Sequence, residues 1–510
     1  MGVYEAVTLA VGAAVTASPG DASRSGEARP LPLDAGLVAQ ADRFVGAESR
    51  QFEILDFMRR VVDVNTHPSN REGIASADRA LILELERLGF VKRVVLSGTQ
   101  KAIPQCRGDK LETSIPVVGN HLYAYRPGKG PHPLDIVIVA HMDTVFDPEN
   151  PFRDFTSQKR DSVHLVTGPG VADSKGSLAV ALFALKTLDF LETPEGENVL
   201  DGFNTTLFVN GDEEEGSLDS SRIFERLARG ERADIKAPVE VKDWPRDVDW
   251  SPRGRPQACL VFSYNSEPGK MATVKGGVGK GLLAWEGEST HPKNFPQKGV
   301  SVVPEIAWDL TAIDGMNYPD TGVSVVVGQG EWGGARNSVP GCGFAKVDIR
   351  FSDKELAQRV ADSIQRTVAT PQTVNPNGRQ VRGLARVFLH RPPWRGGPET
   401  ERLFDLYRDS YRDVARTHGP ELAPQEVVRE GQKEVVFTPV NDLAMGEVRS
   451  GNDANLLGYY GCPTLDGLGL VSVGVHSERE TTTLESLWHR TMTTVRFLLQ
   501  LRAQRKEGRL

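Results

Sequence analysis

Hydrophobic residues occur along the chain in short continuous runs that alternate with wider, helix-like spacings. Residues 134–140 and 205–209 form apolar runs of the kind that lie buried on both faces in a parallel sheet. Residues 177–191, which are rich in Ala and Leu, and residues 217–229 have helical patterns. This alternation predicts a mixed, mostly parallel α/β sheet with helices on both of its faces.

A polar stretch with several prolines at residues 229–257 interrupts this pattern, and we interpret it as an inserted loop. A strand pattern follows at residues 258–263. Further strand patterns lie at residues 281–285, 323–327 and 344–351, and helical patterns lie at residues 299–313 and 353–368. This order indicates a β-α-β-β-α-β unit, which predicts a small second α+β domain of the ferredoxin-like kind. The first pattern resumes at about residue 398 and ends in a helix at residues 482–501.

The length and charge of the chain agree with this division. A chain of 510 residues is expected to form two domains, because a single core rarely grows beyond about 250–300 residues. The net charge of −8 argues against a general nucleic-acid binder, which normally carries a basic excess. No internal segment is a clean membrane span, so we expect no stable membrane insertion.

The N-terminal residues differ in composition from the rest of the chain. Residues 6–17 form a short apolar run that resembles the core of a signal peptide, although Glu5 stands where a basic leader is expected. Residues 18–34 are rich in Pro, Gly, Ser and charged residues, as a flexible tether is. We therefore expect a flexible N-terminal segment, and both a cytoplasmic and an exported location remain open.

The four cysteines are scattered along the chain. They form no C-x-x-C pair, no zinc-finger spacing and no disulfide framework, so we predict buried or free thiols at Cys106, Cys259, Cys342 and Cys462.

Histidine and carboxylate residues gather in five short segments, each at the predicted carboxyl end of a strand or in the loop beyond it. These segments hold His141 with Asp143, Asp173, the acidic run 212–215, Glu267, and His476. Each segment alone has an ordinary structural explanation, such as a buried histidine, a helix cap or a solvated acidic turn. Because ligands of open α/β sheets bind beyond the carboxyl ends of the strands, we interpret the five segments as one site.

The composition of that site indicates two metal ions. Its histidines and carboxylates are ligand types that zinc accepts: His141, Asp173, Glu214, Glu267 and His476. Two ions about 3.5–4 Å apart need a shared carboxylate, which Asp173 can provide. Glu213 is then free to act as general base on the attacking water.

The five segments resemble, in order, the motifs of the dizinc peptidase family of glutamate carboxypeptidase, acetylornithine deacetylase and succinyl-diaminopimelate desuccinylase. The matching motifs are His-x-Asp at 141–143, Gly-x-Gly-x-x-Asp-x-Lys-Gly at 168–176, Asp-Glu-Glu-x-Gly-Ser at 212–217, Glu267, and Gly-x-His-Ser at 474–477. The resemblance implies that Asp173 bridges both ions. It places His141 and Glu267 on one ion and Glu214 and His476 on the other. It also implies that Asp143 orients His141, that Glu213 is the catalytic base, and that the Asp173–Ser174 peptide bond is cis.

The resemblance also implies an inserted lid and further site residues. It divides the chain into a flexible segment at 1–36, a catalytic domain at 37–278 and 392–510, and a lid at 279–391 that supports a homodimer. His291 matches a lid histidine that stabilises the tetrahedral intermediate, often across the dimer. Asn337 and Gly451 match residues that line the substrate pocket, and Arg391 matches an arginine that grips a substrate carboxylate.

Two departures from the family pattern stand out. The loop at 229–257 is long, and about three extra residues, 264–266, precede Glu267. If the run 213–215 were matched to the motif one residue further along, the assigned base and ligand would change. The Gly216-Ser217 pair that follows fixes the match with Glu213 as base and Glu214 as ligand.

The expected function is that of a metal-dependent amidohydrolase. We expect two divalent ions, zinc first, with cobalt or manganese also accepted by such ligands. The expected substrate is a small peptide or an N-acyl amino acid, cleaved in the manner of a glutamate carboxypeptidase. The alternatives are an N-acyl amino-acid deacylase or dipeptidase of the same family and, more distantly, a non-catalytic binding protein.

Overall fold

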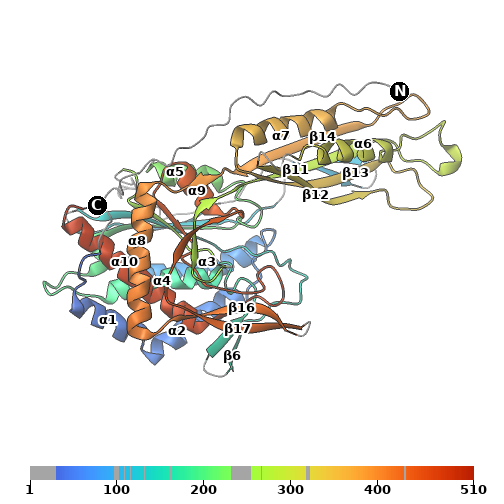
Figure 1. The fold of residues 1–510 in the computed structure, drawn as a ribbon. Coiled ribbons are helices and arrows are strands. Elements are labelled where there is room, and N and C mark those ends of the chain that lie inside the picture. Colours follow the sequence, from blue (N-terminus) through green and yellow to red (C-terminus); the bar gives the residue numbers. More distant parts are fainter. Residues whose placement is uncertain are drawn as a thin grey trace.

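The structure is a computed structural model of the chain. It describes residues 30–96, 103–107, 110–114, 117–130, 132–160, 163–230, 254–265, 267–317, 322–429 and 432–509. Most of the proposed N-terminal tether, the apolar run at 6–17, most of the loop at 229–257, and Ser266 lie outside these residues. Figure 1 shows a large helix-and-sheet body and a smaller body that projects from one of its edges; the names catalytic domain and lid follow the expectation from the sequence.

The catalytic domain is built on a six-stranded sheet with the order β1-β4-β8-β5-β9-β19. Its central strands β8 (Phe203–Asn210), β5 (Leu134–His141), β9 (Ala258–Val261) and β19 (Thr464–Asp466) run parallel. At one edge β4 (His121–Arg126) and β1 (Lys92–Leu96) are antiparallel to their neighbours. The mixed, mostly parallel sheet is the one that the hydrophobic pattern predicts.

Alternating residues of β5 explain why helices cover both faces of this sheet. Ile136 and Ile138 enter one core, whereas Val137 and Val139 enter the other. The larger core is covered by the helices α1 (Ala35–Val45), α2 (Glu48–Val62), α3 (Arg71–Arg87), α4 (Lys175–Phe190), α8 (Pro398–His418) and α10 (Leu484–Lys506). The smaller core is covered by α5 (Ser221–Arg229) and α9 (Asp453–Tyr459). In the part of the chain that the structure describes, no helix has the length and apolarity needed to cross a membrane.

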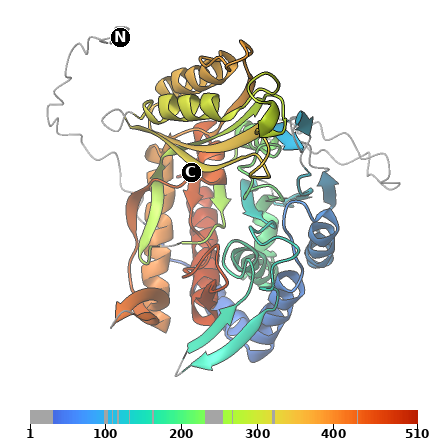
Figure 2. The same cartoon turned by 90° about the vertical axis from the view of Figure 1, so that its right-hand side faces the viewer.

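The lid is a four-stranded antiparallel sheet with the order β12-β13-β11-β14. Its elements follow one another as β11 (Gly277–Glu286), α6 (Val303–Asp314), β12 (Val323–Trp332), β13 (Cys342–Phe351), α7 (Lys354–Ala369) and β14 (Arg382–Arg391). This is the β-α-β-β-α-β order predicted from the sequence. Figures 1 and 2 show both helices on the side of the lid sheet that faces away from the catalytic domain.

Smaller elements complete the fold. One three-stranded sheet joins β15 (Trp394–Arg395), β10 (Lys270–Lys275) and β18 (Ala444–Val448), and another joins β20 (Thr481–Thr483), β7 (Val163–Thr167) and β6 (Thr156–Arg160). Two ribbons are formed by β2 (Ile103–Arg107) with β3 (Lys110–Ser114) and by β16 (Glu421–Arg429) with β17 (Gln432–Val440). Short 3-10 turns lie at η1 (Val199–Gly202) and η2 (Pro292–Asn294).

The cysteine prediction was wrong, because all four cysteines are paired. Cys259 of β9 is bonded to Cys462, which lies just before β19, and Cys106 of β2 is bonded to Cys342 of the lid. The partners are separated by 203 and 236 residues in the sequence. Such pairs arise only when distant strands meet, so spacing along the chain contains no sign of them.

Candidate metal centre and active site

The site lies at the carboxyl edge of the central parallel strands. His141 is the last residue of β5, and it pairs with Asn210, the last residue of β8. The acidic run 212–215 therefore begins beside His141, although the two segments are about seventy residues apart in the chain. This proximity follows from the parallel register of the two strands.

Asp173, just before α4, lies between the two histidines. Its Oδ1 is 2.9 Å from Nε2 of His141, and its Oδ2 is 3.2 Å from Nε2 of His476. His476 has a left-handed backbone with a φ of 61°, and its Nε2 also lies 3.3 Å from Oε2 of Glu214. The Asp173–Ser174 peptide bond is cis, as the resemblance implies. The structure thus brings together four of the five residues expected to bind metal.

The cluster fits a divalent metal. His141, Asp173 and Glu214 each offer one ligand atom, and these atoms lie within 4.8 Å of one another. The Oε1 atom of Glu214 and the Oδ1 atom of Asp143 are buried and have no hydrogen-bond partner. A buried carboxylate oxygen without a hydrogen bond is costly, and a bound cation would remove that cost. The nitrogen and oxygen donors are those that zinc accepts.

Asp143 connects the two ligand loops. Nδ1 of His141 lies 3.1 Å from the main-chain oxygen of Asp143 and 3.4 Å from its carboxylate. The other carboxylate oxygen of Asp143 accepts the N–H of Glu214 at 2.8 Å. Asp143 is therefore placed to fix the ring orientation of His141, largely through its main chain.

Glu213 and Arg391 form a buried pair beside the cluster. The guanidinium of Arg391 lies 2.5 Å from the Glu213 carboxylate and donates to the main-chain oxygens of Glu213 and Gly451 at 2.7 and 2.9 Å. Burial raises the pKa of Glu213, against the opposing effect of the Arg391 charge. In this structure the predicted reader of the substrate carboxylate is bound to the predicted base.

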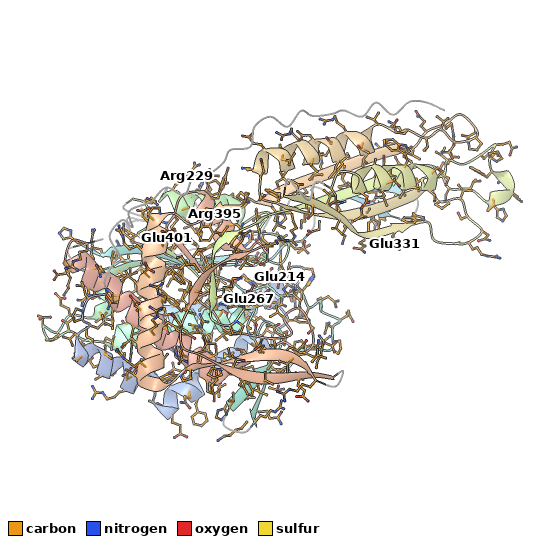
Figure 3. The ribbon with its side chains drawn as sticks, viewed as in Figure 1. Glu214, Arg229, Glu267, Glu331, Arg395 and Glu401 are labelled. Atoms are coloured by element: carbon orange, nitrogen blue, oxygen red, sulfur yellow. A yellow bond between two sulfur atoms is a disulfide. The ribbon has the colours of Figure 1, made fainter. Side chains whose placement is uncertain are left out.

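Glu267, the fifth expected ligand, lines the same cavity but forms its ion pair with Lys270 and not with the cluster. Its carboxylate is 2.9 Å from Nζ of Lys270, and its side chain is 55% exposed. Figure 3 labels Glu214 and Glu267 in the same region of the catalytic domain, but no contact joins Glu267 to His141, Asp173 or Glu214.

The expected lid residues are remote from the cluster. His291 caps η2 and is exposed, and Asn337 is exposed in the loop between β12 and β13. Neither residue lines the cavity at the metal cluster. Arg391 and Gly451 do line it.

The cavity beside the cluster has a volume of about 370 Å³ and is walled by both domains. Its lid wall includes Lys280, Asp348 and Arg350. Each lysine or arginine among the described lining residues is ion-paired with a carboxylate: Lys270, Lys275, Lys280, Arg350 and Arg391. The lining carboxylates outnumber these cations, which leaves a negative excess that divalent ions would offset.

The charges within the cluster shift its protonation equilibria. Burial disfavours the charged form of Asp173, but the hydrogen bonds from His141 and His476 prevail and lower its pKa to about 2. Burial raises the pKa of Glu214 to about 8. The hydrogen bonds to Asp173 and Glu214 raise the pKa of His476 to about 11. Glu214 and His476 therefore keep their protons at neutral pH, which reduces the negative charge of the cluster. Bound metal ions would neutralise the same charge.

Sequence reasoning missed two residues at the site. The buried Glu480 accepts the backbone N–H groups of Gly170, Ala172 and Asp173 at 3.1, 2.9 and 3.0 Å, and so fixes the loop that carries the bridging carboxylate. Its signal was an acid four residues after His476. Tyr264 lines the cavity just beyond β9, where burial and the charges of the neighbouring carboxylates raise its pKa.

Taken together, a histidine–carboxylate cluster at the carboxyl edge of a parallel sheet and a lid over its cavity define a metal-dependent hydrolase. The chain belongs to Peptidase family M20/M25/M40, which matches residues 137–500. It is a metallopeptidase-type hydrolase that acts on peptide bonds.

Known proteins support this placement. The chain is 24% identical to carboxypeptidase G2 of Pseudomonas sp. (strain RS-16) over 471 residues, which cover 90% of this chain and 92% of that protein. The fold is similar to that of human carnosine dipeptidase 1, with a TM-score of 0.58 and 14% identity over 91% of this chain and 100% of that one. It is also similar to an M20 family metallo-carboxypeptidase from Sulfolobus solfataricus, with a TM-score of 0.56 and 14% identity over 90% of this chain and 100% of that one.

Proposed function

We propose that the chain releases an amino acid with a free carboxylate from a small peptide or N-acyl amino acid, and that it uses two divalent ions. The observation that carries the two-ion proposal is the position of Asp173, because its two carboxylate oxygens face two different histidines. Zinc is the expected ion, and cobalt and manganese are the alternatives. The relationship to carboxypeptidase G2 supports the carboxypeptidase-like selectivity.

The metal would be held by His141, Asp173, Glu214 and His476. Bound there, divalent ions supply polarisation of the scissile carbonyl and a lower pKa for the attacking water. Glu213 borders the same cavity and is buried, so its carboxylate can take the proton from that water and deliver it to the leaving nitrogen. The raised pKa of Glu213 makes it a stronger base at neutral pH.

The carboxylate of the substrate would be read by Arg391. A planar guanidinium matches a carboxylate with two hydrogen bonds, and Arg391 lines the cavity where the lid rejoins the catalytic domain. Arg391 is paired with Glu213 in this structure, so it must leave the Glu213 carboxylate in order to bind the carboxylate of a substrate. Glu213 would then be free to act as the base.

A comparison of acid and amide substrates tests this proposal. The kcat/KM of the wild type should fall by at least tenfold when the terminal carboxylate of the substrate is amidated, since a charge-assisted pair is worth roughly 1.5–3 kcal/mol. In Arg391→Ala, the ratio of kcat/KM for the acid to kcat/KM for the amide should approach one. This holds even if both values fall because Glu213 has lost its partner. An unchanged ratio would contradict the reader role.

A second candidate is an N-acyl amino-acid deacylase or dipeptidase that does not read the carboxylate through Arg391. The pairing of Arg391 with Glu213 favours it. An unchanged acid-to-amide ratio, together with activity that chelators abolish, is the result expected for this candidate.

The lid is proposed to serve in a homodimer. His291 is exposed and remote from the cavity of its own chain. In a dimer formed through the lid, His291 could reach the cavity of the partner, where it would hydrogen-bond the developing oxyanion.

A further inference from the structure

A buried ion pair in the wall of the cavity takes no part in the chemistry proposed above. Nζ of Lys275, the last residue of β10, lies 2.5 Å from Oδ2 of Asp466, the last residue of β19, and the side chains are 4% and 3% exposed. Oδ1 of Asp466 accepts the hydroxyl of Ser263 at 2.8 Å and the amide of Asn452 at 2.9 Å. Replacing a buried ion pair with packed apolar residues often costs no stability, so stability alone does not explain this pair.

The pair keeps hydrogen-bonding capacity that it does not use. An ammonium group has three donors, and among the described residues the one of Lys275 donates to Asp466 alone. Oδ2 of Asp466 can accept a second donor beside Lys275. Both residues line the cavity, so a group in the cavity could accept from Lys275 and donate to Asp466 at the same time.

The charge balance of the pair selects the kind of group that fits. Lys275 and Asp466 neutralise each other, so a further charge beside them would stay without a partner in a buried wall. A primary carboxamide is neutral, and it offers one oxygen that accepts and one NH₂ group that donates. It therefore matches the pair better than a carboxylate, an ammonium group or an apolar chain.

The pair also lies close to Arg391. The side-chain amide of Asn455 donates to the main-chain oxygens of Gly276 and Pro392, at 2.9 and 2.8 Å. These two carbonyl groups belong to the residues that directly follow Lys275 and Arg391 in the chain. A substrate whose carboxylate is bound by Arg391 would thus have its side chain within reach of Lys275.

We propose that Lys275 and Asp466 form a specificity subsite for a side-chain carboxamide, so that glutamine or asparagine is released in preference to the corresponding acid. This inference rests on the binding of the substrate carboxylate by Arg391 in the proposed function. The carboxamide oxygen accepts from Lys275, and its NH₂ group donates to Asp466. A substrate carboxylate at the same place would face the charge of Asp466, which disfavours it.

Three N-acetyl amino acids of similar size test the inference. The kcat/KM for N-acetylglutamine should exceed those for N-acetylglutamate and N-acetylmethionine by at least about tenfold, because hydrogen bonds to charged groups are the stronger ones. Calorimetry with free glutamine, glutamate and methionine should give the same order of affinity without any catalysis. If glutamine binds no better than glutamate, the inference is overturned. A binding preference for glutamine without cleavage of any of the three substrates would contradict the proposed function alone.

Two variants should change the selectivity in opposite directions. Asp466→Asn leaves the charge of Lys275 unbalanced, so the ratio of glutamine to glutamate affinity should fall by about tenfold or more. Lys275→Met leaves the charge of Asp466 unbalanced, so free lysine should gain affinity relative to glutamine.

A third lysine of the cavity provides the matched control. Lys280 lines the cavity and pairs with Glu215, and Lys280→Met should leave both affinity ratios within about twofold of the wild type. Circular dichroism shows which variants are folded. Unchanged ratios in a folded Asp466→Asn or Lys275→Met protein would show that the pair does not select the substrate.

Discussion

The carboxyl edge of the central sheet and the lid differ in how well they place the residues that the sequence assigned to them. At the sheet edge, His141, Asp173 and Glu214 each have a ligand atom within 4.8 Å of the others. In the lid, His291 and Asn337 are exposed and lie outside the cavity. Figure 3 also shows Glu331 of the lid well apart from Glu214.

The difference arises from how each position is determined. Parallel strands end at one edge, so side chains at the strand ends or in the first residues beyond them are brought close together within one domain. A lid residue reaches a substrate only through the placement of one whole body against another, or of one chain against a second. Substitutions at the sheet edge should therefore act within a single chain, and lid substitutions should act between chains.

The largest effect is expected at the sheet edge, from Glu213→Gln. The amide keeps the shape of the side chain but cannot accept the proton of the attacking water, so kcat should fall by about 10²–10⁴. Metal content, measured by elemental analysis, should stay near that of the wild type. Glu215→Gln, two positions along the same run, serves as the matched control and should retain most activity. If Glu213→Gln loses metal instead, Glu213 is a ligand and not the base.

The next largest effect is expected in the lid, from His291→Ala. Loss of one hydrogen bond to the oxyanion should lower kcat by about 10²–10³. Because the proposal places His291 at the cavity of the partner, mixing His291→Ala with Glu213→Gln under conditions of subunit exchange should restore about a quarter of wild-type activity in a symmetric dimer. A mixture no more active than its two components would exclude a role across the dimer.

A smaller effect is expected from Glu480→Gln, a substitution that touches the metal only through the loop of Asp173. The amide oxygen can still accept two of the three backbone N–H groups, but its NH₂ group would face the third donor. Metal affinity, measured by competition with a chromogenic chelator, should fall by about 10–100-fold. Thermal unfolding of the metal-free protein provides the control, and a loss of stability without any loss of affinity would contradict a positioning role.

The smallest expected effect is on the pH dependence of the free energy of unfolding. One buried group in each domain should change this free energy, and the two changes should have opposite signs. In the catalytic domain, burial lowers the pKa of His489 to about 4, below its ordinary value of 6.5. The neutral form is favoured by folding, so this contribution is present above pH 6.5 and is lost as the pH falls toward 4. In the lid, burial raises the pKa of Asp309 to about 7, so its contribution is lost as the pH rises through 7.

Denaturant unfolding of two variants checks this contrast. His489→Gln should reduce the loss of stability between pH 7 and pH 5, which is on the order of 2 kcal/mol in the wild type. Asp309→Asn should instead reduce the loss of stability that occurs as the pH rises from 3.8 to about 7. Equal pH dependence in the wild type and both variants would show that neither group contributes.

The sequence predicted the elements that local patterns determine. The apolar run at 134–140 became β5, the Ala- and Leu-rich segment at 177–191 became α4, and the change of pattern near residue 281 marked the lid. The helix predicted at 217–229 begins only at Ser221, because the residues before it belong to the turn that follows the acidic run.

What the sequence could not predict depends on contacts between distant segments. Glu267 forms an ion pair with Lys270 and donates its N–H to Asn265, and no periodicity reports such contacts. The pairing of Arg391 with Glu213 joins residues 178 positions apart, and both disulfides join segments that are still more distant. Motifs name the residues of a site, but only the folded chain shows which of them already have partners.

The disulfide between Cys106 and Cys342 joins the β2–β3 ribbon to the lid. The lid joins the rest of the chain at adjacent points, because Val278 near the start of β11 pairs with Arg391 at the end of β14. Cys342 lies at the opposite end of the sheet, where it pairs with Glu286. The disulfide therefore joins the β2–β3 ribbon to the lid sheet, on which the ribbon also packs. We expect ribbon and lid to move as one unit, and reduction of this disulfide to let them separate.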